Sequence, residues 1–107
     1  MTAPYARILL ATEHTEFDSG AERVAFDLAL RWGASLAAVE PLVTNAEYEA
    51  VAPELAERAD DEAHSRLERL EADARAARVS LEAVVRRETE AWRAIVAEAT
   101  EHRADLV

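Results

Sequence analysis

Four titratable side chains follow the first apolar segment of the chain in close succession: Glu13, His14, Glu16 and Asp18. Carboxylates beside an imidazole can bind a metal ion or exchange protons with a substrate. Glu13 and His14 are adjacent in sequence, however, and share a ligand only if the loop curls. Because a lone histidine is a weak sign of ligation, the sequence favours a solvated acidic loop that caps the following helix. We therefore predict no catalytic and no metal-binding residue.

The composition excludes several kinds of chemistry and of partner. The chain of 107 residues has no cysteine and no lysine, so all 12 basic residues are arginines. Thiolate catalysis, disulfides and cysteine-ligated zinc are thereby excluded, as is a lysine Schiff base. The formal net charge of -10 argues against nucleic acid and against anionic membranes as partners. With no transmembrane-length apolar stretch and no signal-peptide core, we expect a cytoplasmic protein.

Short apolar runs recur along the chain and predict buried strands. Residues 7–12 form the first run, and residues 36–39 form a second that Pro41 limits, since proline cannot donate to a strand ladder. A third strand is expected over residues 79–85. Residues 104–107 have the pattern of the first residues of a fourth strand.

Helical patterns separate these strands. The first ends at Gly33, where we predict a left-handed cap. The second runs from Pro53 to Arg78, after a loop over residues 42–52, and its narrow apolar stripe favours packing on a sheet over a coiled-coil arm. The third begins at Thr89 or Glu90. Strands alternating with helices at this spacing predict a parallel α/β sheet.

The expected buried faces follow from helical spacing. The first helix should bury Ala21, Val24, Ala25, Leu28, Ala29 and Trp32, and the third should bury Trp92, Ile95, Val96 and Ala99. The stripe of the second consists of Leu55, Ala59, Ala63, Leu67, Leu70, Ala74 and Ala77. Its charged surface is expected to contain pairs such as Glu62 with Arg66. His64 and His102 are predicted to be surface residues.

Several segments, taken in order, resemble the universal stress protein family. Residues 8–13, Ile-Leu-Leu-Ala-Thr-Glu, are similar to its opening strand, and residues 21–34 resemble its first helix and Gly-Ala exit. Residues 95–99 and 104–107 resemble its third helix and the start of its fourth strand. With the strand–helix alternation, this resemblance predicts an open parallel sheet of order 3-2-1-4 with helices on both faces, like that of the adenine nucleotide alpha-hydrolases. It implies one domain over residues 1–107, incomplete before its final strand.

The sequence departs from the nucleotide-binding branch of that family at three places. Glu13 stands where the first strand usually ends in Asp, and Glu40-Pro41 aligns with a His-Val pair. The Gly-rich segment that cradles phosphates in that branch would lie beyond Val107. By resemblance, the ligand crevice lies between strands one and four, with residues 11–19 as one wall, so a nucleotide would contact Ala11, Thr12 and Glu13.

The resemblance implies a non-catalytic regulatory or binding domain that acts as a dimer in the stress response. The first alternative is an ATP- or AMP-binding universal stress protein whose nucleotide loop lies beyond Val107. The second is an unrelated Rossmann-like binding fragment. We expect no cofactor in this chain itself, and ATP or AMP as the candidates in a longer chain.

Overall fold

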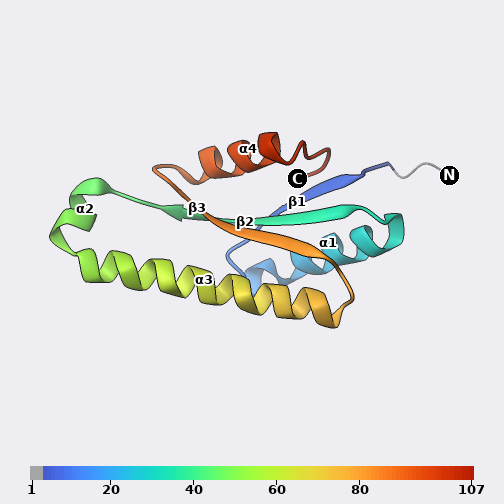
Figure 1. Cartoon of the computed structure of the whole chain (residues 1–107), viewed down its shortest axis with the longest axis horizontal. Coiled ribbons are helices and arrows are strands. Elements are labelled where there is room, and N and C mark those ends of the chain that lie inside the picture. Colours follow the sequence, from blue (N-terminus) through green and yellow to red (C-terminus); the bar gives the residue numbers. More distant parts are fainter. Residues whose placement is uncertain (1–3) are drawn as a thin grey trace.

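The computed structural model describes residues 4–107 and contains a three-stranded parallel sheet (Figure 1). Its strands are β1 (Arg7–Ala11), β2 (Ser35–Val43) and β3 (Leu81–Glu88), with β2 between the other two. This confirms the parallel sheet and the predicted order of its first three strands. At the outer edge of β1, Leu106 forms an isolated parallel bridge with Ile8, and its carbonyl accepts a hydrogen bond from the Leu9 N–H at 2.9 Å. A single bridge therefore stands where a fourth strand was predicted.

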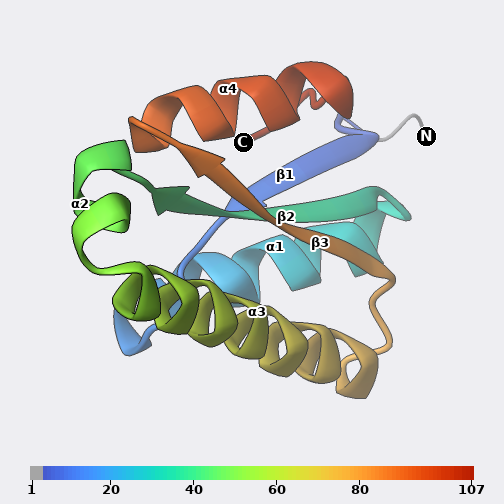
Figure 2. The same cartoon turned by 60° about the vertical axis from the view of Figure 1, so that its left-hand side comes forward.

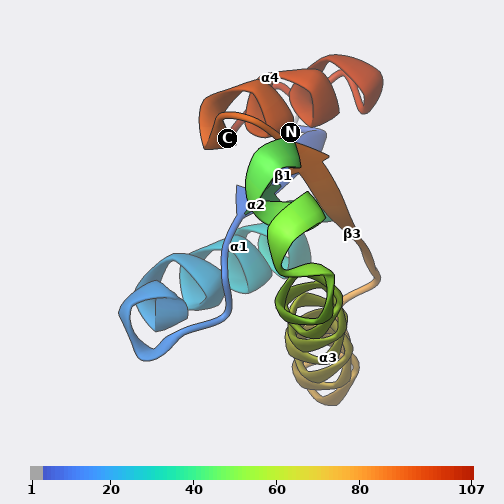
Figure 3. The same ribbon diagram turned by 90° about the vertical axis from the view of Figure 1, so that its left-hand side faces the viewer.

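Helices cover both faces of the sheet, as predicted. Helices α1 (Ser19–Trp32) and α3 (Pro53–Ala76) lie against one face, and α4 (Ala91–Glu101) lies against the other (Figures 2 and 3). Successive residues of a strand point to opposite faces. Ile8 and Leu10 therefore belong to the core under α1 and α3, whereas Leu9 packs with Ile95 and Ala99 under α4.

The second strand is longer than predicted and passes through Pro41. Alternate residues of a strand direct their backbone groups to the same edge. The Val39 carbonyl accepts the Thr12 N–H at 3.1 Å, so the backbone of Pro41 also faces the β1 edge. Because β1 has already ended at Ala11, the missing N–H of Pro41 costs the sheet no hydrogen bond between strands. The strand can therefore continue to Val43.

The segment after β2 is not the predicted loop. It contains a short helix, α2 (Ala46–Val51), which Asn45 caps by accepting the Tyr48 N–H on its side chain at 3.0 Å. The third strand lies later than predicted, because it pairs with the extended part of β2 as far as Val43 and Glu88.

Two helices bury only part of the predicted face: Ala25 and Ala29 of α1 are buried, and Ile95 and Ala99 of α4 pack against the core, but other expected side chains are exposed. In α1, Val24 is 57% exposed and Glu22 is buried. In α4, Trp92 and Val96 are more than half exposed, and Arg93 lies 5.1 Å from the Trp92 ring centroid. The prediction that Trp92 packs in the core is therefore wrong. Trp32, in contrast, is half-buried, with its ring centroid 5.6 Å from that of Tyr5.

Helix α3 packs on the sheet, as predicted, with Ala63, Leu67, Leu70 and Ala74 buried. The β1 exit loop (residues 12–18) contains the 3-10 turn η1 (Glu16–Asp18) and leads into α1. Gly33 ends α1 with φ 64°, which confirms the predicted left-handed cap.

Candidate functional site

A crevice lies where β1 and β2 end and α4 begins. Its volume is about 430 Å³. The lining residues come from the β1 exit loop, β2 and α4: Ala11, Thr12, Glu13, Thr15, Phe17, Asp18, Pro41, Ala91 and Ile95. Ligands of open α/β sheets bind at this edge, outside the carboxyl ends of the strands. Ala11, Thr12 and Glu13, the three residues expected from the resemblance, border this crevice, although it lies beside β2 and α4 and not between strands one and four as expected.

The three expected residues do not offer equivalent groups to a ligand. The side chain of Thr12 is 3% exposed and its hydroxyl donates to Glu22 Oε2 at 2.8 Å. The same hydroxyl accepts the His14 N–H at 2.9 Å. The exposed side chain of Glu13, in contrast, has a free carboxylate among the contacts of the described residues. Glu13 is therefore the expected residue with a polar side chain available at the crevice.

The β1 exit loop is closed on itself by Asp18. One oxygen of this carboxylate accepts from the Thr15 N–H at 3.1 Å, the Thr15 hydroxyl at 2.9 Å and the Glu13 N–H at 3.3 Å. Partial burial raises the pKa of Asp18, but the hydrogen bonds from Thr15 and Glu13 outweigh this effect, so the pKa is lowered. Asp18 is therefore a structural carboxylate that shapes the crevice wall.

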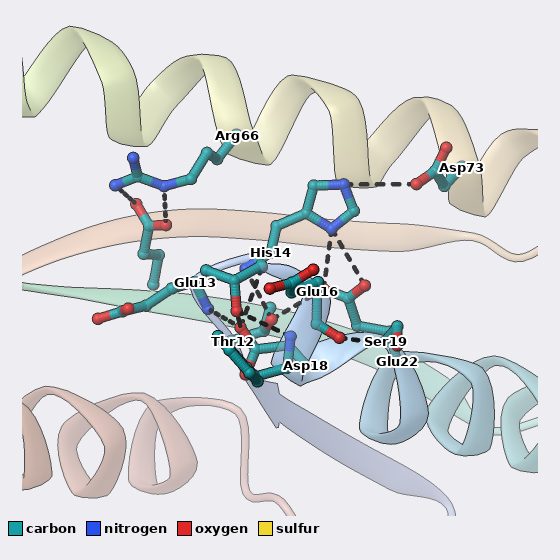
Figure 4. Close-up of polar contacts among 12 residues, drawn as sticks. Thr12, Glu13, His14, Glu16, Asp18, Ser19, Glu22, Arg66 and Asp73 are labelled. Atoms are coloured by element: carbon teal, nitrogen blue, oxygen red, sulfur yellow. Dashed lines mark hydrogen bonds and ion pairs between the residues drawn. The ribbon is translucent and has the colours of Figure 1, made fainter.

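His14 connects this loop to two helices (Figure 4). Its Nδ1 lies 2.9 Å from Glu22 Oε2 on α1, and its Nε2 lies 3.4 Å from Asp73 Oδ2 on α3. The residue has a left-handed backbone, φ 53°, which turns the chain back after β1. Neither Glu22 nor Asp73 was predicted from the sequence as part of the site. Glu22 was detectable, because it stands three and seven residues before the buried Ala25 and Ala29.

A second polar contact fastens the end of β2 to α3 (Figure 4). Glu40 is 1% exposed, and its carboxylate is held bidentately by Arg66, with Nε–Oε1 at 2.7 Å and Nη2–Oε2 at 3.2 Å. Burial raises the pKa of Glu40, and the hydrogen bonds from Arg66 oppose part of that rise. Arg66 thus pairs across to the sheet, not with Glu62 on its own helix as predicted.

A third buried carboxylate lies on the α4 face, at the other side of the sheet. Glu98 accepts from Arg86 of β3 at 2.8 Å and lies 3.1 Å from His102 Nε2. His102 is consequently half-buried, in contrast to its predicted surface position, whereas the exposed position predicted for His64 is confirmed. In residues 4–107, every buried polar side-chain atom has a hydrogen-bond partner.

The crevice is acidic. Glu13 and Asp18 line it, and its described lining contains no arginine. The N-terminus of α4 at Ala91 contributes the crevice's positive partial charge. Among residues 4–107, no group of three or more His, Asp or Glu side chains is placed to hold a metal ion. The geometry thus provides hydrogen-bond acceptors, a helix end and an apolar floor.

Comparison with known proteins connects this arrangement to a family. The model of the universal stress protein family matches residues 4–107. The chain belongs to the universal stress protein family. A solved structure of a family protein from Burkholderia pseudomallei superimposes with a TM-score of 0.79 at 21% identity, covering 95% of this chain and 79% of that one. A universal stress protein solved in complex with cAMP gives 0.72 at 21% identity, covering 95% and 74%.

Both structural matches are distant in sequence and establish the universal stress protein fold of this chain. Among curated proteins, no significant sequence match was found. In the described part of the chain, no helix has the length and apolar character needed to cross a membrane.

Proposed function

We propose that this universal stress protein is a regulatory binding domain of the stress response, not an enzyme, and that its ligand is a nucleoside-type molecule of low negative charge. The observation that supports this most directly is the acidic crevice at the carboxyl ends of β1 and β2, with Glu13 at its wall. A carboxylate at such a crevice commonly accepts hydrogen bonds from ribose hydroxyls.

The charge of the crevice favours some nucleosides over others. Glu13 and Asp18 would repel a triphosphate, and the described lining provides no arginine to compensate. Adenosine carries no phosphate and cAMP carries one negative charge. The cAMP bound to the structurally similar universal stress protein agrees with a ligand of this class. We therefore expect the order of affinity adenosine or cAMP, then AMP, then ATP.

Calorimetry with these four compounds tests the proposal, with Mg²⁺ present for ATP. Changing Glu13→Gln should weaken adenosine binding by about tenfold, the worth of one hydrogen bond to a charged acceptor. The same change should strengthen ATP binding, because it removes a negative charge. Glu16→Gln is the matched control, since Glu16 belongs to the same loop but does not line the crevice. ATP binding with a dissociation constant near or below ~1 μM, or no binding of any of the four, would refute the proposal.

We also propose that the domain acts as a homodimer in which a second copy covers the outer edge of β1. A groove of about 420 Å³ lies beside this edge and is lined by apolar residues and one glycine: Ile8, Leu9, Leu10, Gly20, Ala21, Val24, Ala25, Leu28, Leu106 and Val107. No described residue in this lining is charged, although the chain carries a net charge of -10. Two acidic copies would therefore approach each other here with the least repulsion.

Sedimentation over a range of protein concentrations tests this dimer. Val24→Glu places a charge in the groove and should shift the protein to monomer. Val51→Glu is the control, because Val51 is 86% exposed on α2 and does not line the groove. A wild-type protein that remains monomeric at about 1 mM, where even a weak ~1 mM dimer would be populated, contradicts the proposal.

A further inference from the structure

The imidazole ring of His14 has a carboxylate at each of its two nitrogens (Figure 4). Glu22 Oε2 lies 2.9 Å from Nδ1, and Asp73 Oδ2 lies 3.4 Å from Nε2. The side chain of His14 is 16% exposed, that of Glu22 is 9% exposed and that of Asp73 is 62% exposed. The ring thus lies between a buried acceptor on α1 and a solvated acceptor on α3.

This arrangement suits only one protonation state of the ring. A neutral imidazole has one N–H, and its other nitrogen presents a lone pair. A lone pair that faces a carboxylate gains no hydrogen bond and is repelled. The doubly protonated imidazolium donates to Glu22 from Nδ1 and forms an ion pair with Asp73 at Nε2, so it alone suits both carboxylates together.

We infer that His14 is a positioning residue that fastens the β1 exit loop to α3 only in its doubly protonated form. When the ring is neutral, the proton stays at Nδ1, because the buried Glu22 costs more to leave without a donor than the solvated Asp73 does. The contact that depends on the proton is therefore the one between Nε2 and Asp73. The loop remains attached to α1 and separates from α3.

The other charged groups around the ring do not replace this contact. From α1 the ring faces Glu22, to which the Thr12 hydroxyl also donates. From α3 it faces Asp73, and Arg66 of the same helix is already held by Glu40 of β2. Since Glu13 precedes His14 directly and borders the crevice, the proton on His14 controls how firmly one crevice wall is held.

Amide hydrogen exchange of residues 12–18 tests the inference without any ligand. The wild type and Asp73→Ala are compared at pH 5.5 and again at pH 8.5, so that intrinsic exchange cancels within each pH. At pH 5.5, where histidine is generally charged, Asp73→Ala should speed exchange of the loop about two- to fivefold, as expected for a partly exposed ion pair. At pH 8.5 the two proteins should exchange alike.

Two further variants make the result specific. His14→Gln should abolish the difference that Asp73→Ala causes at pH 5.5. Asp60→Ala removes a comparable contact on the same helix, that with His64 at 3.5 Å, together with an ion pair to Arg87 of β3 at 3.5 Å, and should leave the loop unchanged at both pH values. An equal effect of Asp73→Ala at both pH values, or no effect at pH 5.5, would overturn the inference.

The consequence for binding rests on the proposed function, whereas the attachment of the loop does not. If adenosine binds, its affinity should depend on pH in the wild type and lose that dependence in Asp73→Ala. Failure of the exchange experiment refutes the role of His14 whether or not adenosine binds. A positive exchange experiment with no adenosine binding refutes the proposed function alone.

Discussion

At the scale of single residues, the interior contains an unusual share of carboxylates. Glu22, Glu40 and Glu98 are all at least nine-tenths buried. Each has a polar partner on another element: Thr12 and His14 for Glu22, Arg66 for Glu40 and Arg86 for Glu98. Buried carboxylates without such partners would carry a large desolvation penalty. These three contacts therefore fix how the helices are placed on the sheet.

Removing Arg66 should destabilise the fold in a pH-dependent way. Arg66→Met leaves the Glu40 carboxylate buried without its cation, and we expect a loss of about 2–3 kcal/mol near pH 7, less than for a fully buried pair because Arg66 is 28% exposed. Burial raises the pKa of Glu40. A carboxyl group whose pKa is raised by folding contributes stability below its unfolded-state pKa. That stability is lost as the pH rises through its folded-state pKa.

Arg66→Met takes away the hydrogen bonds that oppose this rise, so its cost should grow between about pH 4.5, an ordinary Glu value, and pH 7. Urea unfolding at several pH values measures the cost. In a Glu40→Gln background the pH dependence of the Arg66→Met effect should disappear. A cost that is constant with pH would show that Glu40 is not its source.

Residue-level prediction from the sequence succeeded where local rules decide and failed where tertiary contacts decide. The position of Ala11 and Glu13 at the carboxyl edge of the sheet could be predicted, because they lie where a buried parallel strand ends, whereas their contact with a nucleotide stays a prediction. Arg66 was assigned to Glu62, four residues earlier, because the sequence cannot show that a buried Glu40 lies across from it. The exposure of Trp92 was missed for the same reason, since Ala94, Ile95 and Glu98, and not Trp92, face the sheet.

At the scale of elements, the helix ends show how a cap can be improved. Gly33 ends α1 in the left-handed region, but Arg78 after α3 adopts the same region with φ 62° and a side chain. We expect Arg78→Gly to stabilise the protein by roughly 0.5–1 kcal/mol, since glycine avoids the strain of a Cβ there at some cost in unfolded-state entropy. Gly33→Ala should act in the opposite direction. Urea denaturation of both variants is the measurement, and a destabilised Arg78→Gly would contradict the argument.

The element bounds show what periodicity leaves undetermined. The starts of α3 and α4 at Pro53 and Ala91 were close to their predicted positions, because Pro and polar residues mark them locally. The extension of β2 through Pro41 could not be predicted, because it depends on which edge of the strand the proline faces. That edge is set by pairing with β1.

The contact between the start of β1 and the end of the chain should depend on Asp105. The side chain accepts from the Ala6 N–H at 3.0 Å and the Arg7 N–H at 2.9 Å, and these two bonds lower the pKa of Asp105. Asp105→Asn should therefore speed amide exchange at Leu9, whose N–H donates to Leu106, by several-fold at pH 7.

The sign with pH follows from the lowered pKa. The contribution of Asp105 to stability is fully present above the ordinary Asp pKa. It is lost as the pH falls through the lowered pKa of the folded protein. The effect of Asp105→Asn should accordingly fade only in strong acid. Asp27→Asn, which removes an exposed pair with Arg31, is the control and should leave Leu9 unchanged. Equal exchange at Leu9 in Asp105→Asn and wild type would refute this role.

At the scale of the whole molecule, the net charge of -10 opposes the compact state through self-repulsion. Raising NaCl from about 10 mM to about 500 mM shortens the screening length from roughly 30 Å to below 10 Å, and so should raise the melting temperature by a few degrees. Sodium sulfate at equal ionic strength should do the same or more. A melting temperature that falls with NaCl would mean that exposed ion pairs such as Arg31–Asp27 outweigh the repulsion.

The different surroundings of the two tryptophans give the molecule separate optical reporters. Trp32 is half-buried against Tyr5, at the opposite end of α1 from the β1 exit loop. Trp92 is 58% exposed, and it is flanked on α4 by Ala91, which lines the crevice. Acrylamide should therefore quench Trp92 first, and a ligand entering the crevice should shield that emission while leaving Trp32 unchanged. Trp32→Phe would isolate the crevice signal, so that occupancy could be followed by fluorescence alone.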